Sequence, residues 1–215
     1  EYSSQFLSQR LYAEYSILKG GQSILKAKKY DLGKGKLSSL MLAMAIPSIV
    51  AQVINILYNM VDRIHIGHIK GIGADALTGV GVAFPIVVFI SAFSAFVGAG
   101  GAPLSAIFQG KGDRDRAEKI LGNGVSMLIF FSAVLMIVFY VFKKPLLFAF
   151  GASENTYSYA SDYISIYLIG TLFVEFSMGL NTYIIAQGKS ITGMLSVLIG
   201  AVANIALDPV FIFVL

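Results

Sequence analysis

Residues 37–61 read LSSLMLAMAIPSIVAQVINILYNMV and contain no Asp, Glu, Lys or Arg. About 20 consecutive apolar residues suffice for an α-helix to cross the hydrocarbon core of a bilayer. This run therefore predicts a membrane-spanning helix, with Pro47 inside it. It lacks the strict alternation of apolar and polar residues that is typical of membrane β-barrel strands, so a helical bundle is the better interpretation.

The composition of the 215-residue chain favours the same fold class. Hydrophobic residues make up 56% and charged residues 13%, and the mean hydropathy is +0.76. A soluble globular domain usually carries about 25% charged residues, so a soluble enzyme, a nucleic-acid binder and a disordered chain all fit poorly. The chain has no cysteine, which excludes disulfides, thiolate metal sites and cysteine nucleophiles. We therefore expect no enzymatic activity, no bound metal or cofactor and no nucleic-acid partner.

Four further charge-poor segments follow the first span, at residues 76–110, 120–142, 163–188 and 190–207. Because the residue before a proline is disfavoured in a helix, Asp208-Pro209 predicts a turn, and the apolar run after it is interpreted as the start of a sixth helix. That run ends seven residues after Asp208, about 10 Å of helix, and the chain begins with Glu instead of Met. We expect a fragment with five helices and the start of a sixth.

Residues 1–29 lack the apolar run of a secretory signal and are assigned to a cytoplasmic extension or leader, and residues 30–215 to a partial transmembrane lobe. The alternative for the first 29 residues is an amphipathic helix on the inner leaflet. Its apolar residues at helical spacing would be Leu7, Leu11, Tyr15 and Leu18.

Basic residues are distributed unequally between the two sides of the predicted bundle, with 12 on one side and 4 on the other. The first set is Arg10, Lys19, Lys26, Lys28, Lys29, Lys34, Lys36, Lys111, Arg114, Arg116, Lys119 and Lys189, and the second is Arg63, Lys70, Lys143 and Lys144. Loops rich in Lys and Arg stay in the cytoplasm. We therefore predict a multi-pass protein of the cytoplasmic membrane with a cytoplasmic N-terminus.

Three acidic residues, Asp62, Glu175 and Asp208, fall within or at the ends of predicted spans. Ionisable groups at membrane depth are costly and are therefore functional candidates. A straight helix from Leu37 to Asp62 would be about 37 Å long. Asp62 therefore either ends the helix among the outer headgroups or, in a tilted or bent helix, faces a cavity. Glu175 is either a buried, hydrogen-bonded packing residue or an acid that carries a proton.

Asp208 lies four residues after Asn204, so both face one side of a helix if the helical phase holds. Their carboxylate and amide oxygens suit a small cation, and a plain interhelical turn is the alternative. His65 and His68 have the spacing of a metal site, but the chain has no other His and no Cys, so interfacial histidines are preferred. Asp115 is expected to cap the third span.

Several short motifs, taken in order, resemble those of one family. They are Ala45-Ile46-Pro47, Leu57-Tyr58-Asn59-Met60-Val61-Asp62-Arg63, Ile66-Gly67-His68, Gln109-Gly110, Ala186-Gln187-Gly188-Lys189 and residues 204–213, NIALDPVFIF. From Tyr30 to Leu215 the chain resembles the first half of a multidrug and toxic compound extrusion (MATE) transporter, and in particular the prokaryotic DNA-damage-inducible branch. The resemblance implies twelve helices in two six-helix lobes, with this chain as the N-terminal lobe and a C-terminal lobe as its partner.

The resemblance also implies export of amphipathic, often cationic, drug-like compounds in exchange for H⁺ or Na⁺. The coupling residues that it implies are Asp62, Asn181, Asn204 and Asp208, and it implies a helix bend at Pro47. It assigns no role to Glu175, which stays a candidate proton or cavity acid. Arg63 departs from the pattern, because relatives often have a small hydroxyl residue there. Its charge beside Asp62 would favour the carboxylate form.

Two other functions stay open. A flippase for lipid-linked oligosaccharides, of the same wider fold, would need basic residues in its cavity to meet phosphates, and Arg63 is the one basic candidate at membrane depth. A structural or regulatory membrane subunit without transport activity is the second alternative.

Overall fold

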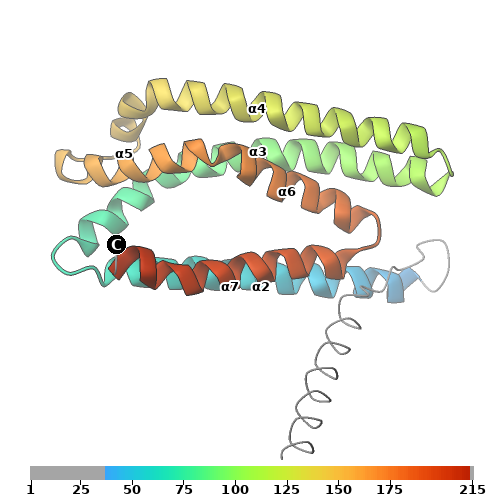
Figure 1. The fold of residues 1–215 in the computed structure, drawn as a ribbon, viewed down its shortest axis with the longest axis horizontal. Helices are drawn as coiled ribbons and strands as arrows, with labels where there is room; N and C mark the ends of the chain where they lie inside the picture. Colours follow the sequence, from blue (N-terminus) through green and yellow to red (C-terminus); the bar gives the residue numbers. More distant parts are fainter. Residues whose placement is uncertain (1–36, 214–215) are drawn as a thin grey trace, which may run out of the picture.

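The computed structural model describes residues 37–213, and within this range the chain forms six α-helices and no strands (Figure 1). The helices are α2 (Leu37–Gly67), α3 (Gly73–Gly110), α4 (Arg114–Ala149), α5 (Glu154–Ile169), α6 (Thr171–Ala186) and α7 (Ser190–Phe213). Four of them, α2, α3, α4 and α7, are long and apolar enough to cross a membrane, and α5 with α6 makes a fifth candidate span. The predicted all-helical, multi-pass membrane fold is confirmed. The predicted extension at residues 1–29 lies outside the described residues.

The helices extend beyond the apolar segments that hydropathy marks. For example, α4 has 36 residues and starts at Arg114, whereas the sequence predicted a span over residues 120–142. A helix of that length is about 54 Å long, against a hydrocarbon core of about 30 Å. The extra turns at each end therefore lie in polar surroundings, where charged residues are tolerated.

The cap of α4 is Asp113 and not Asp115, so the sequence prediction was wrong by two residues. The Asp113 side chain accepts a hydrogen bond from the Arg116 backbone N–H at 3.1 Å and forms an ion pair with the Arg116 side chain, also at 3.1 Å. A cap residue must precede the first helical turn to reach its free N–H groups. Asp115 lies inside that turn, where its negative charge interacts favourably with the positive end of the helix dipole.

The fourth predicted span, residues 163–188, is two helices. α5 begins nine residues earlier than predicted, at Glu154, where Ser153 and Thr156 form a capping box. The chain then bends by 60° between α5 and α6 at Gly170. Hydropathy did not predict the break, because the sequence on both sides of Gly170 stays apolar.

α7 continues through Pro209 to Phe213, so within the described residues no separate sixth helix begins there. A proline inside a helix removes one backbone hydrogen bond, and membrane helices tolerate this where neighbouring groups compensate. Asp208 therefore lies within the fifth span and not at the start of a sixth helix. The helical phase between Asn204 and Asp208 is preserved.

The helices form two layers (Figure 1). One layer holds α2 and α7 side by side, and α7 is the helix that α2 contacts most. The other layer holds α3, α4, α5 and α6. Its core is built from α3, α4 and α5, with Ile90, Leu147 and Ile164 among its fully buried residues. By contrast, the buried residues of α2 in the same structure are Pro47 and Ala51.

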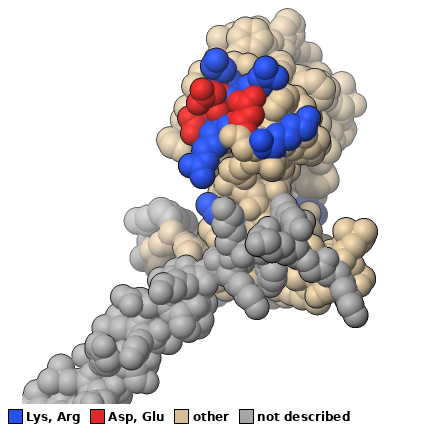
Figure 2. Space-filling view, turned by 90° about the vertical axis from the view of Figure 1, so that its right-hand side faces the viewer, with Lys and Arg blue, Asp and Glu red and all other residues tan. Residues whose placement is uncertain are grey.

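Charged side chains gather at the end of the molecule where α3 connects to α4 (Figure 2). The charged residues of this connection and of the first α4 turns are Lys111, Asp113, Arg114, Asp115, Arg116, Glu118 and Lys119. Lys111 and Arg116 also lie over the Phe108 ring, at 5.6 and 5.5 Å from its centroid. The apolar middle of the bundle is thus bounded by a charged end, as a bilayer requires.

Candidate functional site

The site begins with the packing of α2 against α7, which run in parallel. The Ser190 hydroxyl at the start of α7 donates to the backbone carbonyl of Ala43 near the start of α2, at 3.5 Å. Asp208 is 18 residues after Ser190, and Asp62 is 19 residues after Ala43. At about 1.5 Å per residue, the two carboxylates therefore lie at nearly the same height, near the far end of the pair.

Asp62 and Asp208 are close enough to interact electrostatically. The Asp208 side chain is 9% exposed and that of Asp62 is half-buried. In the described part of the chain, Asp208 Oδ2 and Asn204 Oδ1 are buried and accept no hydrogen bond. Buried acceptor atoms that lack a donor are what a bound proton or small cation would satisfy. The structure thus brings together three of the four coupling residues that the resemblance implied.

Asn181, the fourth, is not brought to this acid pair. Its amide oxygen would lie 2.8 Å from a Cβ atom placed on Gly193 of α7, so the two residues are in contact. Gly193 precedes Asn204 by 11 residues, about 16 Å along the helix. Asn181 therefore lies apart from Asp62, Asn204 and Asp208, the other three residues that the resemblance implied. The amide oxygen of Asn181 is itself buried without a hydrogen-bond donor among the described residues.

His65 interacts electrostatically with both Asp62 and Asp208, which the sequence analysis did not predict. The usable signal was its position three residues after Asp62, which places both on one face of α2. His68 lies one residue beyond the end of α2 and behaves differently, because its Nδ1 lies 2.7 Å from the Ile64 carbonyl of that helix. The two histidines therefore do not act as a pair, and only His65 belongs to the site.

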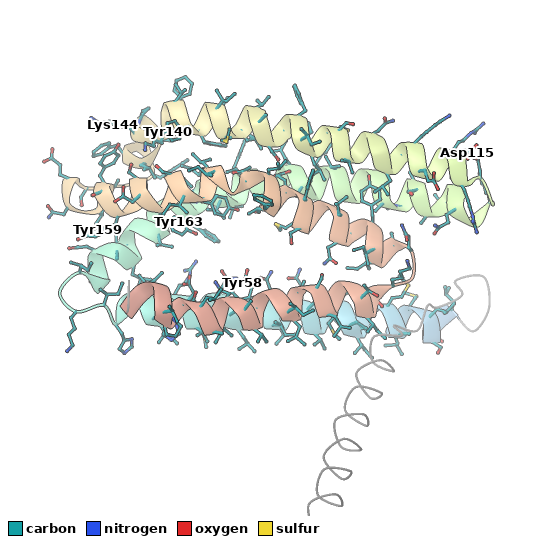
Figure 3. The ribbon with its side chains drawn as sticks, viewed as in Figure 1. Tyr58, Asp115, Tyr140, Lys144, Tyr159 and Tyr163 are labelled. Carbon is teal, nitrogen blue, oxygen red and sulfur yellow. The ribbon has the colours of Figure 1, made fainter. Side chains whose placement is uncertain are left out.

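Two tyrosines complete the surroundings of Asp62. Tyr163 of α5 interacts electrostatically with Asp62 and with Tyr58 of α2. Figure 3 shows Tyr58 on the layer of α2 and α7 and Tyr163 on the layer that faces it. The sequence analysis missed both residues, because their contribution depends on how the two layers meet.

Arg63 does not pair with Asp62 in the structure. Among the described residues the two side chains form no ion pair, and the Arg63 guanidinium lies 5.4 Å from the centre of the Phe84 ring of α3. Neighbouring residues on a helix point about 100° apart, and Arg63 follows the exposed face of α2 whereas Asp62 follows the half-buried one. Arg63 therefore acts on Asp62 through an electrostatic interaction and not through an ion pair.

A row of polar residues on α2 was not singled out from the sequence. Gln52, Asn55 and Asn59 recur at helical spacing on one face, and Gln52 and Asn59 are exposed. Asn59 Nδ2 donates to the Asn55 carbonyl at 2.7 Å. Amides are costly against lipid, so this face of α2, the α2 polar stripe, is suited to a water-filled cavity or another protein.

Glu175 and Pro47 lie apart from the acid pair. Glu175 is fully buried in α6, five residues after the bend at Gly170. Pro47 is buried inside α2, which continues on both sides of it as one helix. Its predicted role as a bend therefore stays a prediction.

The acid pair and its neighbours offer mainly oxygen atoms as ligands, and few of these groups carry a charge. Within residues 37–213 no three His, Cys, Asp or Glu side chains are grouped closely enough to hold a metal ion. Two carboxylates, one amide and one histidine at this spacing are suited to exchange a proton or a weakly held monovalent cation.

These features define an all-helical, multi-pass membrane protein with acidic residues held inside its spans. A family model described as MatE matches residues 47–210. This covers most of the chain, and the chain belongs to the MatE family.

The chain is similar to curated relatives from bacteria. It is 23% identical over 173 residues to the multidrug export protein MepA of Staphylococcus haemolyticus, covering 80% of this chain and 38% of that protein. It is 23% identical over 185 residues to an FAD transporter of Shewanella oneidensis, covering 86% and 40%. A crystal structure described as MATE in the bent conformation matches with a TM-score of 0.76 and 25% identity, covering 84% and 40%. The chain thus spans about two fifths of the length of these relatives.

Proposed function

We propose that this chain is the N-terminal lobe of a transporter that exports amphipathic, often cationic, compounds in exchange for H⁺ or Na⁺. The observation that carries the proposal is that Asp62 and Asp208 lie at nearly the same height on two parallel helices. Buried acceptor oxygens lie beside them. Family membership and the name of the MepA relative support the same function. The complete transporter contains a second lobe, because the matched relatives are more than twice as long.

The acid pair acts as the coupling site. Two carboxylates in surroundings of low dielectric repel each other, and a bound proton or cation relieves that repulsion. If the two orientations of the transporter differ in how closely α2 and α7 bring Asp62 and Asp208 together, they differ in affinity for the cation. An ion gradient then shifts the population from one orientation to the other. Entry of the cation from outside is coupled in this way to release of the exported compound.

The substrate passes along the α2 polar stripe, in a cavity between this lobe and its partner lobe. Amides orient polar groups, and the neighbouring exposed apolar residues of α2 contact the apolar part of the compound. Bending of α2 at Pro47 reshapes this cavity, and one matched structure is described as MATE in the bent conformation. The charged end at the α3–α4 connection faces the cytoplasm, as does the N-terminus, in a cytoplasmic membrane.

The test uses the complete transporter in cells without other efflux pumps. Wild type, Asp62→Asn and Asp208→Asn are compared for efflux of a fluorescent lipophilic cation at matched expression. We expect the efflux rate of each variant to fall by about 5- to 150-fold. This factor corresponds to the loss of a coupling free energy of typical size. A proton-only or sodium-only gradient across vesicles then identifies the ion. Wild-type efflux in both variants would exclude the acid pair as the coupling site.

A second candidate function is export of a phosphate-bearing compound. Arg63 is exposed on the face of α2 beside the polar stripe, and one relative is named an FAD transporter. Arginine binds phosphate through two parallel hydrogen bonds. Arg63→Ser separates the two functions, because it should reduce export of a flavin dinucleotide more strongly than cation efflux if that is the substrate. If wild type exports no flavin dinucleotide and Arg63→Ser loses cation efflux, this candidate is excluded.

A further inference from the structure

A second buried carboxyl lies in the middle of the lobe. Glu175 of α6, Ser94 of α3 and Thr171 of α6 are all buried with 0% exposure. The Ser94 hydroxyl donates to the Glu175 backbone carbonyl at 3.4 Å, and the Thr171 hydroxyl donates to the Tyr167 carbonyl of α5 at 3.3 Å. These four residues, the Glu175 cluster, join three helices at the bend between α5 and α6.

The surroundings of the Glu175 carboxyl favour its neutral form over its charged form. Neither of its oxygens accepts a hydrogen bond of ordinary geometry from the described residues, although the hydroxyl and the backbone N–H of Ser94 lie close enough to donate weakly to the carboxyl. An isolated carboxylate in an apolar interior costs several kcal/mol. A neutral carboxylic acid avoids most of that cost and needs only an acceptor for its O–H group.

The helices that pack against α6 provide no compensating cation beside Glu175. Their ionisable residues are Asp75 in α3, Arg114, Asp115, Arg116, Glu118, Lys119, Tyr140, Lys143 and Lys144 in α4, Glu154, Tyr157, Tyr159, Asp162, Tyr163 and Tyr167 in α5, and Asp208 in α7. Of these, Tyr167 interacts electrostatically with Glu175. The charged residues of α4 lie toward its two ends, as Asp115 and Lys144 show in Figure 3.

The Glu175 cluster is separate from the acid pair but connected to it. Ser94 is the 22nd of the 38 residues of α3, near its middle, whereas Asp62 lies five residues before the end of α2. Tyr163 and Tyr167 stack between the two sites, with ring centroids 6.3 Å apart. Tyr163 interacts electrostatically with Asp62 and Tyr167 with Glu175. Tyrosine hydroxyls can both donate and accept a proton, so they provide a polar connection through an apolar region.

The bend at Gly170 lies five residues before Glu175, at the edge of the cluster. In membrane bundles, broken helices occur where backbone groups are buried in protein or line a cavity, and they often mark binding sites. A change in the 60° angle between α5 and α6 would move Glu175 relative to Ser94, because the two residues lie on different helices.

We propose that the Glu175 cluster is a second proton-binding site of the lobe, distinct from the Asp62–Asp208 pair. In the buried state Glu175 holds the proton as a neutral carboxylic acid. When the bend opens, its O–H bond breaks, the proton passes to water and the carboxylate that remains is hydrated. Only the use of this proton in transport rests on the proposed function, whereas its presence on Glu175 does not.

The test is infrared spectroscopy of the complete transporter in lipid, which detects the C=O stretch of protonated carboxylic acids near neutral pH. We expect Glu175→Gln to remove one such band, because the amide keeps the shape and loses the acid. Glu175→Asp should shift the band without removing it, and this variant serves if the glutamine variant fails to fold. Glu154→Gln, at the exposed start of α5, is the matched control and should leave the band unchanged.

The result that would overturn the proposal is an unchanged protonated-acid region in folded Glu175→Gln or an unshifted one in folded Glu175→Asp. Asp62→Asn and Asp208→Asn distinguish this outcome from failure of the proposed function. If both variants retain full efflux while the band depends on Glu175, the coupling role of the acid pair is wrong and the Glu175 site stands.

Discussion

The two layers of the lobe differ in how tightly they are built. In the layer of α3, α4, α5 and α6, glycines allow close packing. The Tyr183 hydroxyl of α6 occupies the space that side chains on Gly101 of α3 and Gly124 of α4 would fill, and Leu128 packs directly on Gly179. The pair of α2 and α7 is joined to this layer mainly through α2 with α3 and α6 with α7. Asp62 and Asp208 lie on the loosely attached pair.

This difference suggests a division of labour between the layers. A close-packed layer has few alternative arrangements, because a shift of one helix forces side chains into occupied space. A pair of helices with limited contacts can move as a unit at lower cost. Asp62 and Asp208 both lie on this pair, so a cation bound under the proposed function would act directly on it.

The largest expected effect comes from fixing the two layers to each other. This chain has no cysteine, and any cysteine in the rest of the complete transporter is replaced before the pair is introduced. Asn181→Cys with Gly193→Cys places two thiols at the contact between α6 and α7. We expect oxidation of this pair in the complete transporter to reduce efflux by about tenfold or more, because a required motion is blocked. Efflux is compared before oxidation, after oxidation and after reduction.

The matched control links α2 to α7 instead. Ala43→Cys with Ser190→Cys lies where the two helices are already joined by a hydrogen bond. A cross-link within a pair that moves as a unit should change efflux by no more than about twofold. Equal inhibition by both cross-links would contradict the division into a mobile pair and a fixed layer.

The next effect concerns the stability of the close-packed layer. A Cβ atom on Gly101 would overlap the Tyr183 hydroxyl, which is buried without a hydrogen-bond partner among the described residues. Overpacking of this kind costs about 1–3 kcal/mol, so Gly101→Ala should lower the thermal unfolding temperature of the complete transporter in detergent. Gly100→Ala, which has open space around it, should be neutral or slightly stabilising.

Tyr183→Phe tests the cause of that loss. The substitution removes the Tyr183 hydroxyl, which overlaps the added Cβ atom and makes no hydrogen bond among the described residues. Alone it should therefore lower the stability little. Combined with Gly101→Ala it should restore part of the lost stability. If the double variant is no more stable than Gly101→Ala, the overlap with Tyr183 is not what destabilises it.

The sequence predicted the class of fold because hydropathy depends on local composition. The run from Leu37 to Val61 and the positions of the other spans followed from the absence of charge. The break at Gly170 could not be read in this way, because its flanks are equally apolar and the bend depends on packing against α3. The continuation of α7 through Pro209 was missed for a similar reason, since the local preference before proline opposes it and contacts with α2 outweigh it.

The candidate site was predicted in part. Asp62 and Asp208 were found because charge in a span is rare, and Asn204 was found by helical spacing. Tyr163 was missed because nothing in its own sequence surroundings distinguishes it, and His65 was considered only together with His68, although it lies three residues after Asp62. Asn181 was included through the resemblance alone, and the structure places it against Gly193. Sequence thus identified unusual residue types, and only the packing of α2, α5, α6 and α7 decided which of them meet.

A smaller effect should follow from changes in the α2 polar stripe. Asn59→Leu removes an exposed amide and its hydrogen bond to the Asn55 carbonyl. We expect the KM for exported compounds to rise by about three- to tenfold, in keeping with the loss of one hydrogen bond of ordinary strength, while the dependence on the ion gradient is unchanged. Met136→Leu, at an exposed apolar residue of α4, should leave KM unchanged. An altered ion dependence in Asn59→Leu would instead place the stripe within the coupling site.

The smallest effect should arise at the start of α5, at the edge of the fixed layer. The Ser153 hydroxyl accepts a hydrogen bond from the Thr156 backbone N–H at 3.3 Å, and the Thr156 hydroxyl accepts one from the Ser153 N–H at 2.9 Å. Ser153→Ala removes half of this box and should cost about 0.5–1 kcal/mol, measured as unfolding in denaturant. Efflux should be unaffected, because the cap stabilises a helix end that the coupling acids do not contact. A loss of efflux without a loss of stability would show that the start of α5 takes part in the motion, and the layer could then no longer be regarded as fixed.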